Sequence, residues 1–312
     1  SHYMEKGQSI EFNRFYTKYV PRLENSRLHL FFWDYINHSV NQNYELSIAA
    51  ARSHFKEAKI NGNNDDLSTS YRFMAKAFMN LNVKDSSLFY ANLALNYARR
   101  SNSENAVLKT FKTQSEIYNH FGMIGRSTSV LIKFIDEAEK TRDEKSICWG
   151  TIQIAHKSFQ IRYYNEAKTY LRKALSLAEK NGATFYSSII HRGLAEISLA
   201  LEDIDDAKKQ LKRCTPLIDS KEQSANNSLI KLTNAKLLIL ENHYNDAREE
   251  LEEIVDQFDN LHHNEGKANA FNLLGQLFFK KQQWKNSEEY HKKSLVLLSQ
   301  DEFNPIRLAN HK

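Results

Sequence analysis

The sequence predicts an all-α fold, a right-handed superhelical solenoid of about seven helix hairpins, and two observations support this prediction. Glycine and proline are scarce, at 9 and 3 of 312 residues. Sandwiches, barrels and doubly wound sheets need many tight turns built from these residues, so the composition disfavours all three. The chain also repeats itself with a period of 40 residues and without any insertion, which is typical of helical repeat proteins.

Two columns of small residues define the repeat. The column that we place on the second helix of each hairpin reads Ser47, Ser87, Ser127, Ala167, Ala207, Ala247 and Ser287. The column on the first helix lies 12 positions earlier and reads Tyr35, Ala75, Ser115, Ala155, Ala195, Ala235 and Gly275. Small side chains in paired positions allow two helices to approach closely where they cross. Each repeat is therefore expected to be a hairpin of two helices.

The elements follow in order along the chain. Residues 1–27 are expected to form a capping helix that ends at Pro21, and residues 301–312 a tail. Between them the predicted repeats span 28–67, 68–107, 108–147, 148–187, 188–227, 228–267 and 268–300. Each holds two apolar-periodic stretches, such as Ser68–Leu81 and Ser86–Arg99. A single hairpin cannot bury its apolar face alone, so the repeats must stack.

This pattern resembles the tetratricopeptide repeat. The spacing of 12 between the small columns is similar to that of the family, and Phe271, Leu274, Gly275 and Phe278 match its first-helix signature in the last repeat. The resemblance covers residues 28–300, with 40 residues per repeat rather than about 34. HEAT and armadillo repeats also have periods of about 40 residues, but no mid-helix proline recurs here. The resemblance implies an inner, concave surface lined by the first helices.

The composition and the motifs favour a binding protein over an enzyme. The chain has 43 Lys and Arg against 38 Asp and Glu, a smaller excess than a dedicated nucleic-acid binder usually carries. We found no metal-binding, nucleophile or phosphate-loop motif, and His262-His263 is interpreted as a solvated loop. No enzymatic activity, cofactor or metal is therefore predicted. Cys148 and Cys214 are expected to be reduced thiols in a cytoplasmic protein, the alternative being a periplasmic sensor domain whose leader has been removed.

The candidate ligand-binding residues follow from the resemblance, because the family's inner-face positions can be transferred to this chain. They are Arg72, Lys76, Lys109, Lys112, Asn119, Trp149, His156, Phe159, Arg192 and Glu196. Five cations are expected along one groove, with the aromatic rings supplying flat apolar surface beside them. Such a groove suits an extended acidic peptide or a C-terminal carboxylate. The carboxylate clamp of chaperone receptors is not reproduced, since Thr113 and Gln153 stand where two of its members belong.

The predicted function is non-enzymatic binding of a protein or peptide. The local sequence Lys84–Ala91 resembles the sensor portions of bacterial regulators, particularly those of Bacteroidetes. This resemblance implies the sensory or interaction domain of a signalling or transcriptional regulator. One alternative is a cytoplasmic peptide-pheromone receptor, similar to the quorum-sensing regulators of Gram-positive bacteria. A second is a helical-repeat nucleic-acid-binding protein, although direct contact with nucleic acid is not expected from the charge balance. No membrane segment is predicted within the chain, and the oligomeric state is left open.

Overall fold

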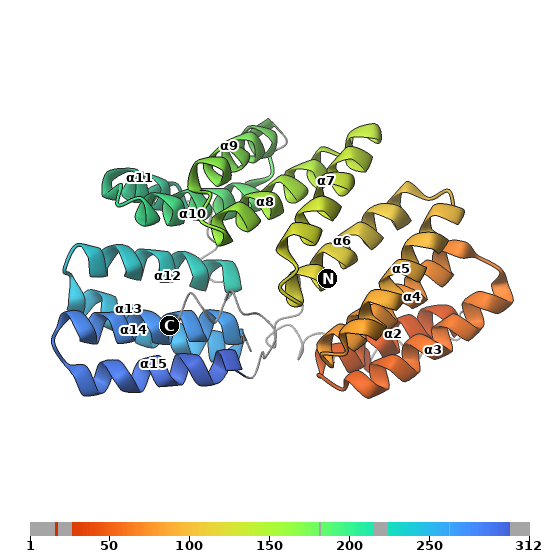
Figure 1. Cartoon of the computed structure of the whole chain (residues 1–312), viewed down its shortest axis with the longest axis horizontal. Helices are drawn as coiled ribbons and strands as arrows, with labels where there is room; N and C mark the ends of the chain where they lie inside the picture. Colours follow the sequence, from red (N-terminus) through yellow and green to blue (C-terminus); the bar gives the residue numbers. More distant parts are fainter. Residues whose placement is uncertain (1–15, 18–26, 181, 215–223, 262, 300–312) are drawn as a thin grey trace. The chain divides into compact units, whose positions relative to one another are not determined.

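The computed structural model describes residues 16–17, 27–180, 182–214, 224–261 and 263–299 (Figure 1). The predicted all-α fold is confirmed, since these residues form helices and connecting turns and contain no strand. The helices are α2 (Arg27–Val40), α3 (Tyr44–Asn61), α4 (Asn64–Asn80), α5 (Lys84–Arg100), α6 (Glu104–His120), α7 (Ile124–Lys140), α8 (Glu144–Gln160), α9 (Tyr164–Lys180), α10 (Thr184–Ala200), α11 (Ile204–Cys214), α12 (Ala225–Leu240), α13 (Tyr244–Asn260), α14 (Asn264–Lys280) and α15 (Trp284–Ser299). Apart from Tyr16 and Thr17, the expected capping helix lies outside the described residues, as do the tail 301–312 and His262.

The 40-residue period is visible in the helix boundaries. The second helices α3, α5, α7, α9, α11, α13 and α15 begin at residues 44, 84, 124, 164, 204, 244 and 284. The first helix of the second hairpin begins at Asn64, four residues before the expected Ser68. Its start is fixed by Asn63, whose side chain accepts a hydrogen bond of 2.9 Å from the backbone N–H of Asp65. Such a cap satisfies one of the donors that a helix N-terminus leaves free.

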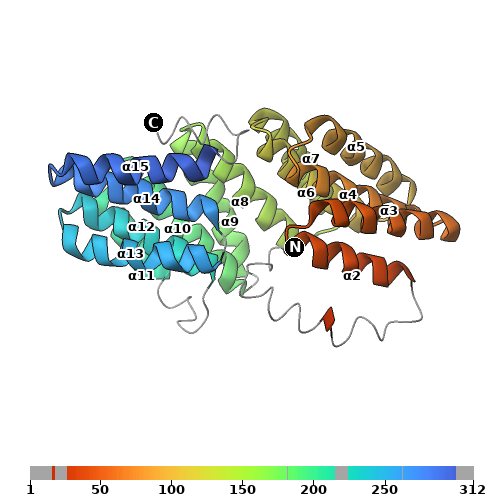
Figure 2. The same cartoon turned by 90° about the horizontal axis from the view of Figure 1, so that it is seen from below.

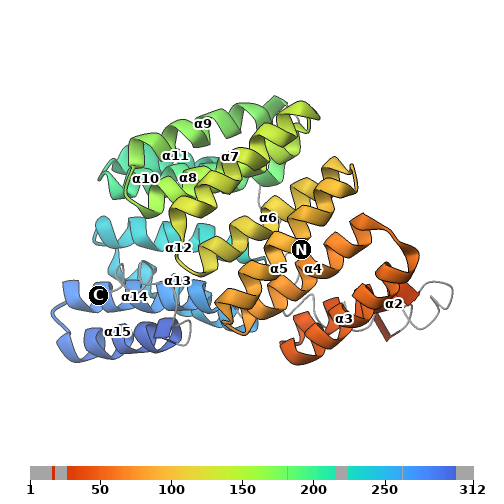
Figure 3. The same ribbon diagram turned by 45° about the vertical axis from the view of Figure 1, so that its right-hand side comes forward.

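The chain divides into two compact units, which we describe separately. Unit 1 comprises residues 1–143 with helices α2 to α7, and unit 2 comprises residues 144–312 with helices α8 to α15. In unit 1, consecutive helices pack against each other, and the first helices α4 and α6 are also in contact (Figure 3). In unit 2, α12, α13, α14 and α15 run side by side (Figure 2), and α10 contacts both α8 and α12. First helices are therefore neighbours within each unit.

The two small columns meet where the helices of a hairpin cross. In the second hairpin the Ser87 hydroxyl donates a hydrogen bond of 2.8 Å to the carbonyl oxygen of Ala75. The last hairpin repeats this bond between Ser287 and Gly275 at 2.9 Å. A hydroxyl can reach a carbonyl on the facing helix only when the backbones lie close together. The spacing of 12 residues between the two small columns thus reflects direct contact between the two helices of a hairpin.

Two residues that break the first-helix column are compensated elsewhere. Tyr35 is the one large member of that column, and it lies in a buried cluster with Ala51, which is 0% exposed. Gly275 is the smallest member, and a Cβ added to it would lie 2.7 Å from the imidazole of His291. In both hairpins the residue 16 positions later differs in size in the opposite sense, since small Ala51 follows Tyr35 and large His291 follows Gly275.

The hairpin turns rely on residues other than glycine. The residues with positive φ in these turns are Gln42, Asn82, Gly122, Arg162, Glu202, Asn242 and Gln282, again 40 positions apart. Only one of the seven is glycine, although the left-handed conformation costs other residues about 1–2 kcal/mol. The chain can therefore make tight turns despite its low glycine content, because the packing of the flanking helices outweighs this local cost.

Candidate functional site

A cluster of charged side chains lies on the first helices of unit 1. Arg72 and Lys76 are four residues apart on α4, and Lys112 and Glu116 are four residues apart on α6. Residues at this spacing share one face of a helix, and α4 and α6 are in contact. We call Arg72, Lys76, Lys112 and Glu116 the basic cluster. It combines three cations and one carboxylate, and Tyr35 of α2 adjoins it.

Hydrogen bonds and an ion pair satisfy some polar groups of the basic cluster, but one donor of Arg72 has no partner among the described residues. Lys76 Nζ lies 2.9 Å from Glu116 Oε2, and both side chains are about a quarter exposed, at 26% and 29%. Arg72 Nη2 donates to the hydroxyl of Thr69 at 2.8 Å. The Nε of Arg72 is buried and has no hydrogen-bond partner among the described residues. A buried donor without a partner costs about 1–3 kcal/mol, so it marks a place where an acceptor would bind favourably.

The electrostatics of the basic cluster show too little negative charge. Burial lowers the pKa of the Arg72 guanidinium, and the attraction of Asp65, Tyr35 and Glu116 does not restore it. Burial likewise lowers the pKa of Lys112 despite the nearby Glu116. Burial also acts against the charged form of Lys76, but Glu116 and Tyr35 offset it and leave the pKa of Lys76 raised. Glu116 therefore pairs with Lys76 and also attracts Arg72 and Lys112, and Asp65 adds a second negative charge near Arg72. Burial still outweighs these attractions at Arg72 and Lys112.

Tyr35 forms the apolar side of the basic cluster. It is 3% exposed and stacks on Phe73, with 4.0 Å between the ring centroids. Burial raises the pKa of its hydroxyl, which therefore stays neutral. Neither Tyr35 nor Glu116 was among the residues predicted from the sequence. Glu116 could have been found from its spacing of four from Lys112, and Tyr35 from its size in a column of small residues.

The structure brings together three of the five candidates predicted in unit 1. Arg72, Lys76 and Lys112 belong to the basic cluster. Lys109 lies on α6 three residues before Lys112, but its side chain is exposed. Asn119 is partly buried near the end of α6, three residues after Glu116. The site in unit 1 is therefore narrower than the predicted row of side chains.

In unit 2 the predicted Arg192 and Glu196 form an ion pair along α10. Glu196 Oε1 also accepts a hydrogen bond of 3.2 Å from the hydroxyl of Thr233 on the neighbouring first helix α12. The Nε of Arg192 is buried without a hydrogen-bond partner in the described part of the chain, as is Oδ1 of Asn226 at the start of α12. Asn226 uses its amide NH₂ to donate to the Ser188 hydroxyl at 2.9 Å. Neither Thr233 nor Asn226 was among the residues predicted from the sequence.

The remaining candidates on α8 differ from expectation. The prediction that Trp149 offers a flat ring to a ligand is wrong, because the residue is only 9% exposed. Helix α8 packs against both α9 and α10. Phe159 packs against the core cluster of unit 2, with its ring centroid 5.5 Å from that of Tyr164. His156 is exposed. The predicted cations Arg72, Lys76 and Lys112 thus belong to unit 1, whereas these aromatic candidates belong to unit 2.

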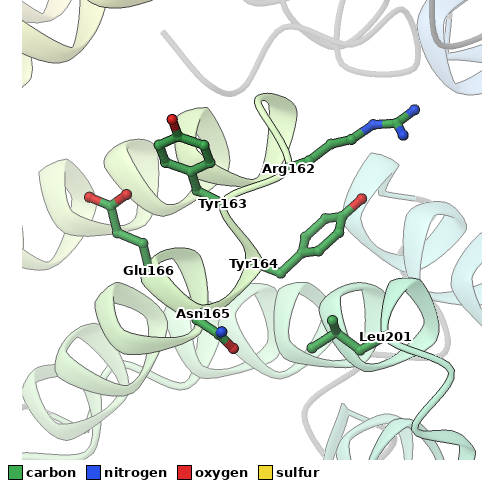
Figure 4. A pocket seen from close by; sticks show the side chains of 6 residues that line it. All are labelled: Arg162, Tyr163, Tyr164, Asn165, Glu166 and Leu201. Carbon is green, nitrogen blue, oxygen red and sulfur yellow. The ribbon is translucent and has the colours of Figure 1, made fainter.

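A shallow depression of about 340 Å³ lies between two hairpin turns of unit 2 (Figure 4). It is lined by Arg162, Tyr163, Tyr164, Asn165, Glu166 and Leu201. Figure 4 shows that the side chains of Arg162 and Glu166 point away from each other. A catalytic or small-molecule site needs polar groups that converge on one point. This depression lacks that arrangement.

The cysteine and histidine residues singled out in the sequence have structural roles. The predicted free thiols are confirmed, since Cys148 and Cys214 are both buried and unbridged. The thiol of Cys148 on α8 approaches the carbonyl oxygen of Ala174 on α9 at 3.5 Å, and the thiol of Cys214 on α11 approaches that of Ser188 on α10 at 3.6 Å. The two thiols thus lie at the same helix contact in adjacent hairpins, one on the first helix and the other on the second. His263 Nδ1 accepts a hydrogen bond from the backbone of Gly266 at 2.8 Å and caps α14. The described residues contain no group of three or more metal-ligating side chains.

Among the described residues, no helix is both long enough and apolar enough to cross a membrane.

No known family profile matches the sequence, and no curated protein matches it either. Several solved structures are nevertheless similar in fold. Aspartyl phosphate phosphatase F from Bacillus subtilis has a TM-score of 0.74 at 11% identity, over 86% of this chain and 70% of that one. The signal transduction ATPase PH0952 from Pyrococcus horikoshii, with a tetratricopeptide repeat sensor, has a TM-score of 0.69 at 15% identity, over 96% of this chain and 47% of that one. The Rap conjugation gene regulator of plasmid pLS20, in complex with the Phr* peptide, has a TM-score of 0.61 at 13% identity, over 88% and 74%.

These similarities show the fold. At 11–15% identity they do not transfer an activity or a ligand to this chain. The shared architecture is a helical solenoid of the tetratricopeptide type, as the resemblance in the sequence predicted.

Proposed function

We propose that this protein is a non-catalytic regulatory module that binds a protein or peptide segment along its first helices. The observation that carries the proposal is the pair of buried arginine Nε groups, Arg72 on α4 and Arg192 on α10, that have no hydrogen-bond partner in the described residues. Both lie on first helices, where acceptor-rich backbone or carboxylate groups of a ligand would satisfy them. Asn226 adds an unpartnered acceptor beside α10.

The structural neighbours support this proposal. One of them is a gene regulator in complex with a peptide, and another carries its tetratricopeptide repeats as a sensor. We accordingly propose the sensory or interaction part of a bacterial signalling or transcriptional regulator. A receptor for a short signalling peptide is the narrower form of the same proposal. The proposed location is the cytoplasm, in keeping with the unbridged thiols of Cys148 and Cys214.

We infer binding rather than catalysis, although one neighbour is an aspartyl phosphate phosphatase. The polar groups of the basic cluster are cations with a single carboxylate, and Glu116 is already engaged with Lys76. This set offers no nucleophile paired with a base. Acetyl phosphate, an acyl phosphate mimic, tests the inference: release of phosphate above the buffer rate by purified protein would contradict it.

The experiment for the main proposal is selection from a library. A synthetic heptapeptide library is passed over the immobilised full chain, and the retained peptides are identified by mass spectrometry. We expect a defined set to be retained by the wild type and lost in the Arg72→Gln/Arg192→Gln double variant. The matched control is Lys84→Gln/Lys133→Gln, which removes the same charge from exposed positions and should retain the set. Retention of nothing by the wild type would refute the proposal.

A nucleic-acid ligand is the competing outcome. Binding to single-stranded oligonucleotides would be detected by fluorescence anisotropy, and its affinity would fall steeply as the salt concentration rises. The proposal expects no such binding at physiological ionic strength, because the basic cluster holds only three cations and all three are partly buried.

A further inference from the structure

The basic cluster of unit 1 contains a charge imbalance that its own residues do not correct. Glu116 is the only carboxylate in the cluster, and it lies 2.9 Å from Lys76. Arg72 reaches a neutral hydroxyl with Nη2, while its Nε remains buried and unpartnered among the described residues. Lys112 is electrostatically coupled to both Lys76 and Glu116. Three cations on two helices thus face Glu116, with Asp65 on α4 adding one further negative charge near Arg72.

We propose that the basic cluster is a carboxylate-binding site, and that Glu116 partly fills it by holding Lys76 when no ligand is bound. The proposal rests on the proposed peptide-binding function and names the chemistry of the ligand: it carries a carboxylate that docks between Arg72 on α4 and Lys112 on α6. Arginine suits this role because its guanidinium donates in a fixed plane that matches a carboxylate. The aromatic wall of Tyr35 and Phe73 lowers the local dielectric and strengthens the interaction.

Glu116 makes the proposal specific, because the proposal predicts that one substitution raises the carboxylate affinity while others lower it. A second carboxylate entering the cluster is repelled by Glu116. Glu116→Gln keeps the shape of the side chain and removes that repulsion, so carboxylate affinity should rise by about tenfold. Arg72→Gln and Lys112→Gln should each lower the affinity by about tenfold or more. Lys109→Gln is the matched control, since it removes an exposed cation from the same helix and should change the affinity less than about twofold.

The first test uses glutarate as the probe and the full chain labelled with ¹⁵N-arginine. The Nε–Hε resonance of Arg72 is assigned from its absence in Arg72→Lys, and glutarate is titrated at constant ionic strength. We expect a saturable shift of this resonance in the wild type, at lower glutarate concentration in Glu116→Gln and unchanged in Lys109→Gln. A resonance that does not shift, or a Glu116→Gln variant no tighter than the wild type, overturns the proposal.

The second test separates the two sources of a peptide carboxylate. One acetylated hexapeptide carries two glutamates and an amidated C-terminus, and the other carries two glutamines and a free C-terminal carboxylate. Displacement of glutarate from Arg72 by the first assigns the site to acidic side chains, and displacement by the second assigns it to the chain terminus. Displacement by neither overturns the assignment to a peptide.

The outcomes also distinguish this inference from the proposed function. If glutarate binds at Arg72 but the heptapeptide library is not retained, the carboxylate site stands and the peptide-binding function fails. If library peptides are retained but Arg72 does not respond to glutarate or to these peptides, the function stands and the carboxylate site is wrong.

Discussion

Replacing His54 with glutamine should make the protein less sensitive to acid. His54 lies on α3 and is only 2% exposed. Its Nδ1 lies 2.7 Å from the Ser70 hydroxyl oxygen, and its ring meets Phe73 edge-on, with 5.5 Å between centroids. Burial, followed by repulsion from Arg72 and His29, lowers the pKa of His54 from 6.5 to about 4. The folded protein therefore keeps this imidazole neutral at pH 5, where the unfolded chain protonates it.

The size of the effect follows from the difference in pKa between the two states. Between pH 6.5 and about 4 the unfolded state binds one more proton at His54, so the free energy of unfolding falls as the pH falls. Each pH unit within this window contributes about 1.4 kcal/mol, which gives a loss of about 3 kcal/mol in total. The contribution is fully present above pH 6.5 and is lost once the pH has passed through about 4. Glutamine can keep a hydrogen bond to Ser70 but does not titrate.

The assay is urea unfolding of the wild type and His54→Gln, followed by helical circular dichroism from pH 7 to pH 3.5. The other titrating groups are common to both proteins, so the difference in the free energy of unfolding isolates His54. We expect the wild type to lose about 3 kcal/mol more than the variant over this range. A difference that stays constant to within about 0.5 kcal/mol, or an NMR titration of His54 near pH 6.5, would refute the reasoning.

Three further predictions follow from the turns, the helix crossings and the thiols. Glu202 occupies the left-handed region with φ of 60°, so Glu202→Gly should raise the free energy of unfolding by about 0.5–1 kcal/mol, and an unchanged urea midpoint would contradict the assigned strain. Gly275→Ala places a Cβ 2.7 Å from the His291 ring and should lower the free energy of unfolding by about 1–3 kcal/mol. The double variant Gly275→Ala/His291→Ala should recover part of this loss in thermal unfolding, and effects of the two substitutions that simply add would count against the contact. Burial raises the pKa of Cys148 and Cys214 to about 11 each, so neither thiol should react with Ellman's reagent at pH 8 in the folded protein. Both thiols should react in urea, and rapid labelling without denaturant would show that the two side chains are not buried.

The sequence alone determined the repeat and most of the fold. A period of 40 residues and two small columns 12 apart are properties of one hairpin and its nearest neighbour. The same local contact, such as that between Ser87 and Ala75, is made again in later hairpins. The apolar pattern did not give the helix boundaries, because the side chain of Asn63 caps α4 and α4 begins before the apolar pattern does. Repetition therefore made the architecture readable without a structure.

The tertiary structure decided which charged residues meet. Arg72 and Lys112 were both predicted to face a ligand, but the sequence could not show that Glu116 forms an ion pair with Lys76. It also placed Trp149 on the surface, whereas the residue is only 9% exposed. The physical reason is that periodicity gives the position of a residue along a helix, while its contacts depend on the rotation of the helix and on how neighbouring helices cross. The charge balance of the basic cluster is a property of that packing, because burial of the cations and the missing acceptor at Arg72 exist only once the helices have met.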